Sequence, residues 1–281
     1  MRIDAHQHFM KYNPAEYPWV SDENHMLKSV FMPDDLYPIM KNANMDGTIA
    51  VQARQSIEET EWLLDLADQY DWIKGVVGWL DICSPDFENQ LQKYINLPKL
   101  KGIRHVIHDE PDDSFMLSDR FLRGMDILQN YDLTYDLLIF ERHLPQTIQL
   151  VKQFPNQKFV IDHIGKPLMN TKEPSAFWKE HIEELAGFNN VYCKISGLVT
   201  EPKYENWRAE DFTPYLDILF TLFRPNRLMI GSDWPVCTVR SDYQSVMSIV
   251  TNYISSFTAE EKEYVLGRSC AEFYGLESAF F

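Results

Sequence analysis

The chain has 281 residues, of which 45% are hydrophobic and 24% charged, as in an ordinary globular protein. Its 26 lysines and arginines against 42 aspartates and glutamates give a net charge of -16, so no surplus of cations exists to bind a nucleic-acid backbone or an anionic membrane surface. We therefore expect neither nucleic acid nor membrane as a partner, and the acidic balance favours a neutral small-molecule substrate.

The sequence begins MRIDAHQHF, without the apolar stretch of a signal peptide, and it has no run of about 18 apolar residues that could span a membrane. The four cysteines are far apart, form no CxxC pair and do not suggest a disulfide framework. These features predict a cytoplasmic protein with reduced cysteines. Glycine-rich phosphate loops and the GxSxG motif of serine hydrolases are absent from the sequence.

Short β-rich runs recur along the chain, each followed by a longer segment with helical spacing of apolar residues. The predicted strands are residues 2–8, 47–53, 73–80, 101–107, 133–139, 158–164, 191–196 and 227–232. The amphipathic helical segments are 58–70, 119–131, 145–154, 175–188 and 212–223, and a helical tail over 257–281 is expected to close the barrel exterior. Repeated strand–helix units predict a parallel (β/α)8 TIM barrel, with residues 1–281 as one domain. A doubly wound open sheet is the structural alternative.

Two insertions make the predicted units longer than a barrel requires. Residues 9–36 follow the first strand, and residues 109–118, reading DEPDDSFMLS, follow the fourth. Both come after strand ends, where barrel enzymes build their sites. Each insertion is either a cover for a substrate or a solvated loop, and the sequence leaves both readings open.

The sharpest local motif is His6-Gln7-His8 at the end of the first predicted strand. Residues i and i+2 of a strand project to the same face, so both imidazoles should point together into the mouth of the barrel. Burying two adjacent histidines is costly unless they share a metal ion or a hydrogen-bonded ligand.

Two further strand ends carry polar groups. His163 ends an apolar run before Gly165 and Pro167, and Asp233 ends the last predicted strand in the stretch GSDWP. Taken alone, each is as easily a helix cap or a hydrogen-bonded strand end. The first and eighth strands of a closed barrel are neighbours, however, and closure would bring these side chains together with His6 and His8.

These motifs together resemble those of the amidohydrolase superfamily, which has a (β/α)8 barrel, a His-x-His pair on the first strand and an aspartate on the eighth. The resemblance is strongest to its sugar-lactonase branch, the group of L-fuconolactonase-type and L-rhamnonolactonase-type enzymes. It extends over essentially the whole chain, in the stretches DAHQHF, VQARQSIEETEWLL, GVVGWLD, GIRHVIHDEPDD, LTYDLLIFERHLP, DHIGKP, VYCKISGLVTE and RLMIGSDWPVC.

The resemblance implies that His6, His8, His163 and Asp233 are the catalytic and metal-binding residues. Two-metal members of the superfamily use a carboxylated lysine on the fourth strand, but Lys101 lies at the wrong end of that strand here. One divalent ion is therefore implied, and imidazole and carboxylate ligands favour zinc. Some lactonases of the superfamily work without metal, so metal-independent catalysis is the alternative.

Five more residues are candidates for substrate binding. Arg104 and His105 are adjacent on the fourth predicted strand and point to opposite faces, so only one can easily face the interior. His108 stands where we expect glutamine in relatives, which puts its role in question. Arg54, after the second predicted strand, and Lys166, close to His163, complete the set.

The resemblance implies hydrolysis of a neutral sugar-acid lactone, such as L-fucono- or L-rhamnonolactone, with Asp233 as general base on water. Three alternatives remain: a metal-dependent decarboxylase, an amide or imine hydrolase of the same superfamily, and a non-catalytic sugar-acid-binding barrel. Association into a homo-oligomer through the outer helices is also left open by the sequence.

Overall fold

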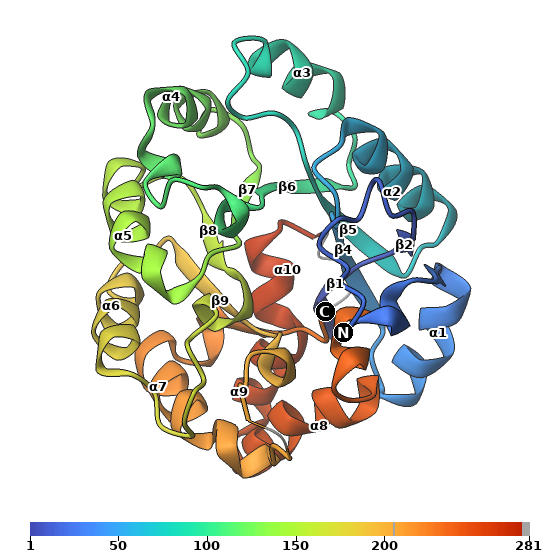
Figure 1. Ribbon diagram of the computed structural model, residues 1–281, viewed down its shortest axis with the longest axis vertical. Helices are drawn as coiled ribbons and strands as arrows, with labels where there is room; N and C mark the ends of the chain where they lie inside the picture. The colour runs from blue at the N-terminus through green and yellow to red at the C-terminus, as the bar shows by residue number, and fades with distance from the viewer. Residues whose placement is uncertain (205, 277–281) are drawn as a thin grey trace.

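The computed structural model describes residues 1–204 and 206–276. In this part of the chain, eight parallel strands form one sheet in the order β1-β4-β5-β6-β7-β8-β9-β10, surrounded by helices (Figure 1). The strands are β1 (Ile3–Gln7), β4 (Gly47–Val51), β5 (Ile73–Gly78), β6 (Leu100–His105), β7 (Thr134–Leu137), β8 (Phe159–Ile161), β9 (Val191–Ile195) and β10 (Leu228–Ile230). The predicted (β/α)8 barrel is confirmed, and each predicted strand is present.

Every barrel strand ends one to three residues before its predicted end. The polar residues at those positions have left the hydrogen-bonded ladder and turn into loops. His8 lies just beyond β1, His163 lies in a 3-10 turn after β8, and Asp233 follows β10. The sequence pattern therefore located the strands, but it overestimated their length where the candidate site begins.

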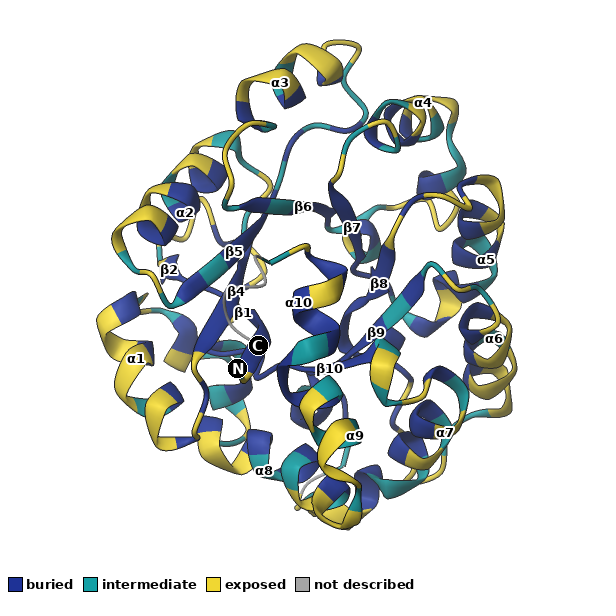
Figure 2. Ribbon diagram, turned by 180° about the vertical axis from the view of Figure 1, so that it is seen from behind, coloured by how far each residue is buried: buried dark blue, intermediate teal, exposed yellow. Residues whose placement is uncertain are grey.

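Helices cover the outside of the sheet, with their buried faces toward the strands and their exposed faces outward (Figure 2). The five predicted helical segments are α2 (Ile57–Gln69), α4 (Asp119–Leu128), α5 (Leu144–Gln153), α6 (Ala176–Ala186) and α7 (Thr213–Phe223). Further helices are α1 (Pro33–Asn42), α3 (Phe87–Tyr94) and α8 (Tyr243–Tyr253). None of the helices in the described residues is both long and apolar enough to cross a membrane.

The C-terminal tail differs from expectation. The short helices α9 (Ala259–Glu263) and α10 (Ser269–Phe273) follow α8, and residues 277–281 of the expected helix lie outside the described residues. α10 lies in the middle of the ring of helices (Figure 1) rather than on its exterior. Phe273 and Tyr274 pack in one buried cluster with Ile3, Val77 and other strand residues, so the tail closes one end of the barrel.

The first insertion forms a small structure of its own. The two-residue strands β2 (Met10–Lys11) and β3 (Val30–Phe31) pair in antiparallel fashion. Met10 of β2 and the intervening residues Tyr17, Val20 and Leu27 form a separate buried cluster. The insertion is therefore anchored by packing at these residues, while many of its other residues, Glu16 and Trp19 among them, are exposed.

The barrel closes between β1 and the residues that follow β10. The Asp233 amide donates to the His6 carbonyl at 2.8 Å, and the His8 amide donates to the Trp234 carbonyl at 2.7 Å. Beneath these bonds, the buried Asp4 carboxylate accepts from the Ser232 amide at 2.9 Å and from the Ser232 hydroxyl at 2.6 Å. The carboxylate thus joins the first strand to the last.

Replacing Asp4 with alanine should lower the free energy of unfolding by about 3 kcal/mol or more, because buried donors lose a charged acceptor. Tyr243→Phe removes only the bond of 3.0 Å from its hydroxyl to Asp4 and should cost about 1 kcal/mol. Urea unfolding of both variants measures these costs. An Asp4→Ala protein as stable as wild type would contradict the role of Asp4 in closure.

Candidate active site

The four residues predicted to form the reaction centre meet in the barrel mouth, all buried. His8 and Asp233 come together through the strand-closing bonds described above, with His8 Nε2 3.3 Å from Asp233 Oδ1. His6 Nε2 lies 3.2 Å from His8 Nε2 and 3.8 Å from the same carboxylate oxygen. His163 Nε2 lies 4.0 Å from it. The convergence predicted from three strand ends is present.

A local irregularity turns His6 into the barrel. Asp4 and His6 are two residues apart, yet Asp4 contacts Tyr243 of the outer helix α8, whereas His6 contacts Lys194 on β9. The register of β1 against β4 shifts by one residue between Asp4 and Gln7. This shift breaks the alternation of a regular strand, and His6 faces the interior in consequence.

The Nδ1 atoms of His8 and His163 have contacts outside the cluster, and these contacts orient the Nε2 atoms toward it. His8 Nδ1 lies 2.8 Å from the Val51 carbonyl, which can only accept, so Nδ1 carries a proton, and Nε2 is the ring nitrogen that faces the cluster. His163 Nδ1 lies 2.9 Å from the Ser196 hydroxyl, and its Nε2 faces Asp233. Such outer contacts fix the tautomer of metal-binding histidines in proteins.

Strained backbone positions two of these side chains. His163 and Asp233 have positive φ angles of 53° and 59°, a conformation that residues other than glycine adopt rarely. Gly197 lets His163 fit, because a Cβ atom at that position would lie 2.7 Å from His163 Nδ1. Strain of this kind costs of order 1–3 kcal/mol per residue and clusters at functional sites.

The protonation states of His6, His163 and Asp233 suit ligands of a metal ion. Burial lowers the pKa of His6 and of His163 well below the usual value, so both are neutral imidazoles near pH 7. For Asp233, burial would raise the pKa, but the interactions with His163 and with His8 outweigh it and the pKa is lowered. The cluster therefore combines lone pairs of neutral imidazoles with an ionised carboxylate.

This donor set fits one zinc-like ion. Bonds of about 2.0–2.2 Å to nitrogen and oxygen place the ligand atoms of a tetrahedral ion roughly 3.3 Å apart. The separations among His6, His8 and Asp233, from 3.2 to 3.8 Å, lie close to that value. His163 Nε2 lies 4.0 Å from Asp233 Oδ1, but its ligand atom does not lie close to all three of that trio.

A second trio of possible ligands, His6, Asp162 and His163, lies beside the first. Its carboxylate, Asp162, already forms ion pairs with two cations. Lys194 Nζ lies 3.0 Å from Asp162 Oδ1, and Arg104 Nη1 lies 3.0 Å from Asp162 Oδ2. Burial opposes the charge of Asp162, but Lys194 together with His6 and Arg104 holds its pKa well below the usual value. A second metal dication there would face two fixed positive charges.

Lys194 is the least expected member of this region. It is fully buried on β9 and forms ion pairs with Asp136 of β7 and with Asp162. Burial would lower the pKa of Lys194, but the two carboxylates outweigh it and the pKa is raised, so the side chain stays charged. Its Nζ also lies 3.2 Å from His6 Nδ1.

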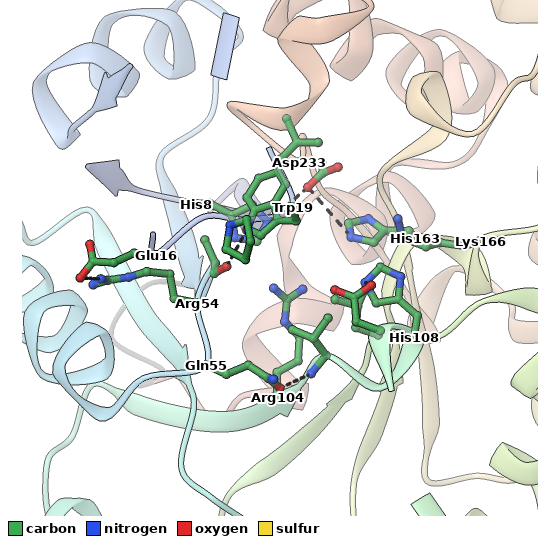
Figure 3. A pocket seen from close by; sticks show the side chains of 16 residues that line it. His8, Glu16, Trp19, Arg54, Gln55, Arg104, His108, His163, Lys166 and Asp233 are labelled. Atoms are coloured by element: carbon green, nitrogen blue, oxygen red, sulfur yellow. Dashed lines mark hydrogen bonds and ion pairs between the residues drawn. The ribbon is translucent and has the colours of Figure 1, made fainter. Parts of the chain in front are cut away.

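The site opens into a cavity of about 450 Å³ that is lined by residues from several strand ends and from the first insertion (Figure 3). The lining residues are His8, Glu16, Pro18, Trp19, Ala53, Arg54, Gln55, Arg104, Val106, His108, Asp109, Leu138, His163, Lys166, Asp233 and Val236. Arg54, Arg104, His108 and Lys166, predicted as substrate-binding residues, are among them. The cavity is large enough for a small-molecule ligand.

His105 is placed differently from the other candidates. It does not appear among the described residues that line the cavity. Its ring stacks on Phe115 with 4.8 Å between centroids, and its Nε2 lies 2.6 Å from Glu110 Oε1. Arg104 is the member of the adjacent pair that faces inward. The geometry gives His105 a structural contact with the second insertion, and Phe115 of that insertion belongs to the buried core.

The cations of the cavity are already neutralised. Arg54 pairs with Glu16 at 2.9 Å and with Glu59 at 3.2 Å, and Arg104 pairs with Asp162. Lys166 lies 3.2 Å from Glu201. Among the described residues, each lysine and arginine lining the cavity thus has a carboxylate partner, and the cavity offers no surplus charge to a strongly anionic ligand.

Several polar residues of the site were not predicted from the sequence, because the local sequence patterns around them are weak. Asp162 precedes His163 directly, and Lys194 is the single charged residue of the strand VYCKI. A charged residue in an otherwise apolar strand is the pattern that could have marked Lys194. Glu16 and Trp19 carried no local motif, because only the folding of the insertion brings them to the cavity.

Comparison with known proteins agrees with this fold. The amidohydrolase family matches residues 3–276, so the chain belongs to that family. An L-fucono-1,5-lactonase of Burkholderia multivorans is 38% identical over 98% of this chain and 96% of its own, and one of Burkholderia ambifaria is 32% identical over 98% and 96%. A crystal structure of a B. multivorans amidohydrolase with bound zinc superposes with a TM-score of 0.94 at 38% identity, covering 99% of this chain and 100% of that one.

His108 should make stability depend on pH. Burial, with the charges of Lys166 and Arg104, lowers its pKa from 6.5 to about 3. Below pH 6.5 the unfolded chain binds a proton that the folded chain does not, so wild type loses stability as the pH falls from 6.5 toward 3. When the pH is lowered from 7 to 5, the free energy of unfolding of His108→Gln should therefore rise by about 2 kcal/mol relative to that of wild type.

Urea unfolding at the two pH values measures this difference, and the same substitution at exposed His25 is the matched control. A His108→Gln protein whose stability difference from wild type is equal at pH 7 and pH 5 would show that His108 is not held neutral by its surroundings.

Proposed function

We propose that this protein hydrolyses a neutral sugar-acid lactone to the open-chain acid, and that L-fucono-1,5-lactone is the first substrate to test. The observation that carries the proposal is the cluster of His6, His8, His163 and Asp233 at the base of a cavity whose cations are all paired. The lactonases of two Burkholderia species, similar over nearly the whole chain, support the choice of substrate.

The roles of the residues follow from their chemistry. Asp233 is an ionised carboxylate beside the cavity, so it takes a proton from the attacking water and later returns it to the ring oxygen that leaves. Arg104 and Lys166 line the same cavity and provide N–H donors for the oxygen that becomes negative in the tetrahedral intermediate. His108, as a neutral imidazole, adds a polar contact for the substrate.

We further propose that His6, His8, His163 and Asp233 hold one zinc ion. The spacing of the ligand atoms of His6, His8 and Asp233 and the neutral imidazoles of His6 and His163 support this, and a similar B. multivorans structure contains zinc. When bound, such an ion polarises a carbonyl group and lowers the pKa of water.

The alternative reactions fit the cavity less well. A decarboxylase has to bind the full charge of a substrate carboxylate, whereas Arg54, Arg104 and Lys166 are each paired with a carboxylate of the protein, which leaves the cavity without excess positive charge although their N–H groups can still donate. A non-catalytic binding protein has no use for strained His163 and Asp233 directed at one point. The net charge of -16 supports a small neutral ligand rather than nucleic acid.

We also infer a cytoplasmic location. The four cysteines are unpaired, and Cys193, Cys237 and Cys270 are buried among apolar residues, which suits a reducing compartment.

Asp233→Asn should reduce kcat for lactone opening by about 10²- to 10⁴-fold, because the amide cannot accept the proton from water. The release of acid, followed with a pH indicator, measures the rate. Asp65→Asn, on the exposed face of α2, is the matched control and should retain wild-type activity. An Asp233→Asn enzyme with near-normal activity would eliminate Asp233 as the base.

Chelation should remove activity, and one equivalent of zinc per chain should restore it. Elemental analysis of protein purified without a metal-affinity tag should find zinc in wild type and much less in His8→Ala, because that variant lacks one donor of the cluster. Full activity in protein shown to be free of metal would support the metal-independent alternative instead.

A further inference from the structure

The first insertion contributes two side chains to the cavity that the proposed chemistry does not use. Glu16 and Trp19 line it, although they lie outside the barrel strands. Figure 3 shows Glu16 and Arg54 on one side of the cavity and His163, Lys166 and His108 on the other. The cavity therefore has a reaction side and a second side that is formed largely by residues 16–19 and 53–55.

This second side is fixed in place before any ligand binds. Tyr17 is buried, and its hydroxyl donates to Glu59 at 3.4 Å. The Trp19 indole N–H donates to the Ala53 carbonyl at 3.2 Å, so the orientation of the ring is set. Glu59 in turn accepts from the backbone amides of Ala53 and Arg54 at 2.9 and 2.7 Å. The insertion and the end of β4 are thus joined as one rigid wall.

The charges of this wall are unequal. Arg54 Nε lies 3.2 Å from the buried Glu59, which already neutralises the guanidinium, and Arg54 Nη1 lies 2.9 Å from Glu16. Two carboxylates and one guanidinium leave one negative charge in excess. The Glu16 side chain is 47% exposed, so it retains acceptor capacity for a ligand. Hydroxyl groups are the neutral donors that a carboxylate with spare lone pairs can bind.

Trp19 adds an apolar face to the same wall. It is 37% exposed in spite of its size. An aromatic face held beside a carboxylate and a guanidinium suits a ring that is apolar on its C–H face and polar at its edge. A hydroxylated lactone ring has this character, whereas its carbonyl belongs on the reaction side.

We propose that Glu16, Trp19 and Arg54 form the subsite that recognises the ring hydroxyl groups of the substrate and sets the preference for a polyhydroxylated lactone. The inference rests on the proposed function and adds a specificity determinant to it. The first insertion is then the specificity element, and the strand ends carry out the reaction.

The test compares two 1,5-lactones, L-fucono-1,5-lactone and the unsubstituted δ-valerolactone, with wild type, Glu16→Ala and Trp19→Leu. Glu16→Ala should lose about 10- to 100-fold in kcat/KM for the sugar lactone, because it removes contacts to hydroxyl groups that only this substrate carries, and its kcat/KM for δ-valerolactone should stay within about twofold of wild type. Trp19→Leu removes the contact to the C–H face that both rings present, so it should lower kcat/KM for both lactones. Glu23→Ala, an exposed glutamate of the same insertion, is the matched control and should change neither value.

Glu16→Gln provides a second variant of nearly the same size, and it should lose less than Glu16→Ala because the amide oxygen still accepts a hydrogen bond. Equal losses of Glu16→Ala on both lactones, or no loss on either for Glu16→Ala or for Trp19→Leu, would overturn the subsite while leaving the lactonase proposal intact. A wild-type enzyme that opens neither lactone would instead refute the proposed function, and the subsite with it.

Discussion

The site depends on the buried Asp162 carboxylate, which lies between two cations in the barrel interior. Lys194 and Arg104 each approach it to 3.0 Å, and His6 Nδ1 lies 3.3 Å from it. The desolvation of these charges is offset only while all partners are present, and removing one from such a group typically costs about 3–5 kcal/mol. The network thereby fixes His6, the imidazole around which the other donors are arranged.

The same network limits what the site can hold. It places two permanent positive charges where the second trio of ligands would bind a metal, each 3.0 Å from the Asp162 carboxylate. Of the residues at the mouth, His6 lies near the same two cations, with Lys194 Nζ 3.2 Å from its Nδ1 and Arg104 Nη1 3.4 Å from its Nε2. Arg104 therefore has two consequences. It pairs with Asp162, and it also lines the cavity.

Much of this arrangement could be predicted from the sequence. Alternating patterns gave the barrel, and polar residues at strand ends gave His6, His8, His163 and Asp233. Local patterns could not show that β1 shifts its register to turn His6 inward, because the shift depends on pairing with β4. The partners of Lys194 come from β7 and from the turn after β8, far apart in sequence, so no spacing rule connects them. Glu16 and Trp19 reach the cavity only through the packing of their insertion.

The central claim is that one metal ion occupies the mouth of the barrel and that Arg104 and Lys194 exclude a second. Anomalous X-ray scattering from crystals equilibrated with zinc tests it most directly. The account predicts one ion per chain, about 2.0–2.2 Å from donor atoms of His6, His8, His163 and Asp233, with no ion at Asp162. A second ion bound by Asp162, or zinc bound only elsewhere, would contradict it.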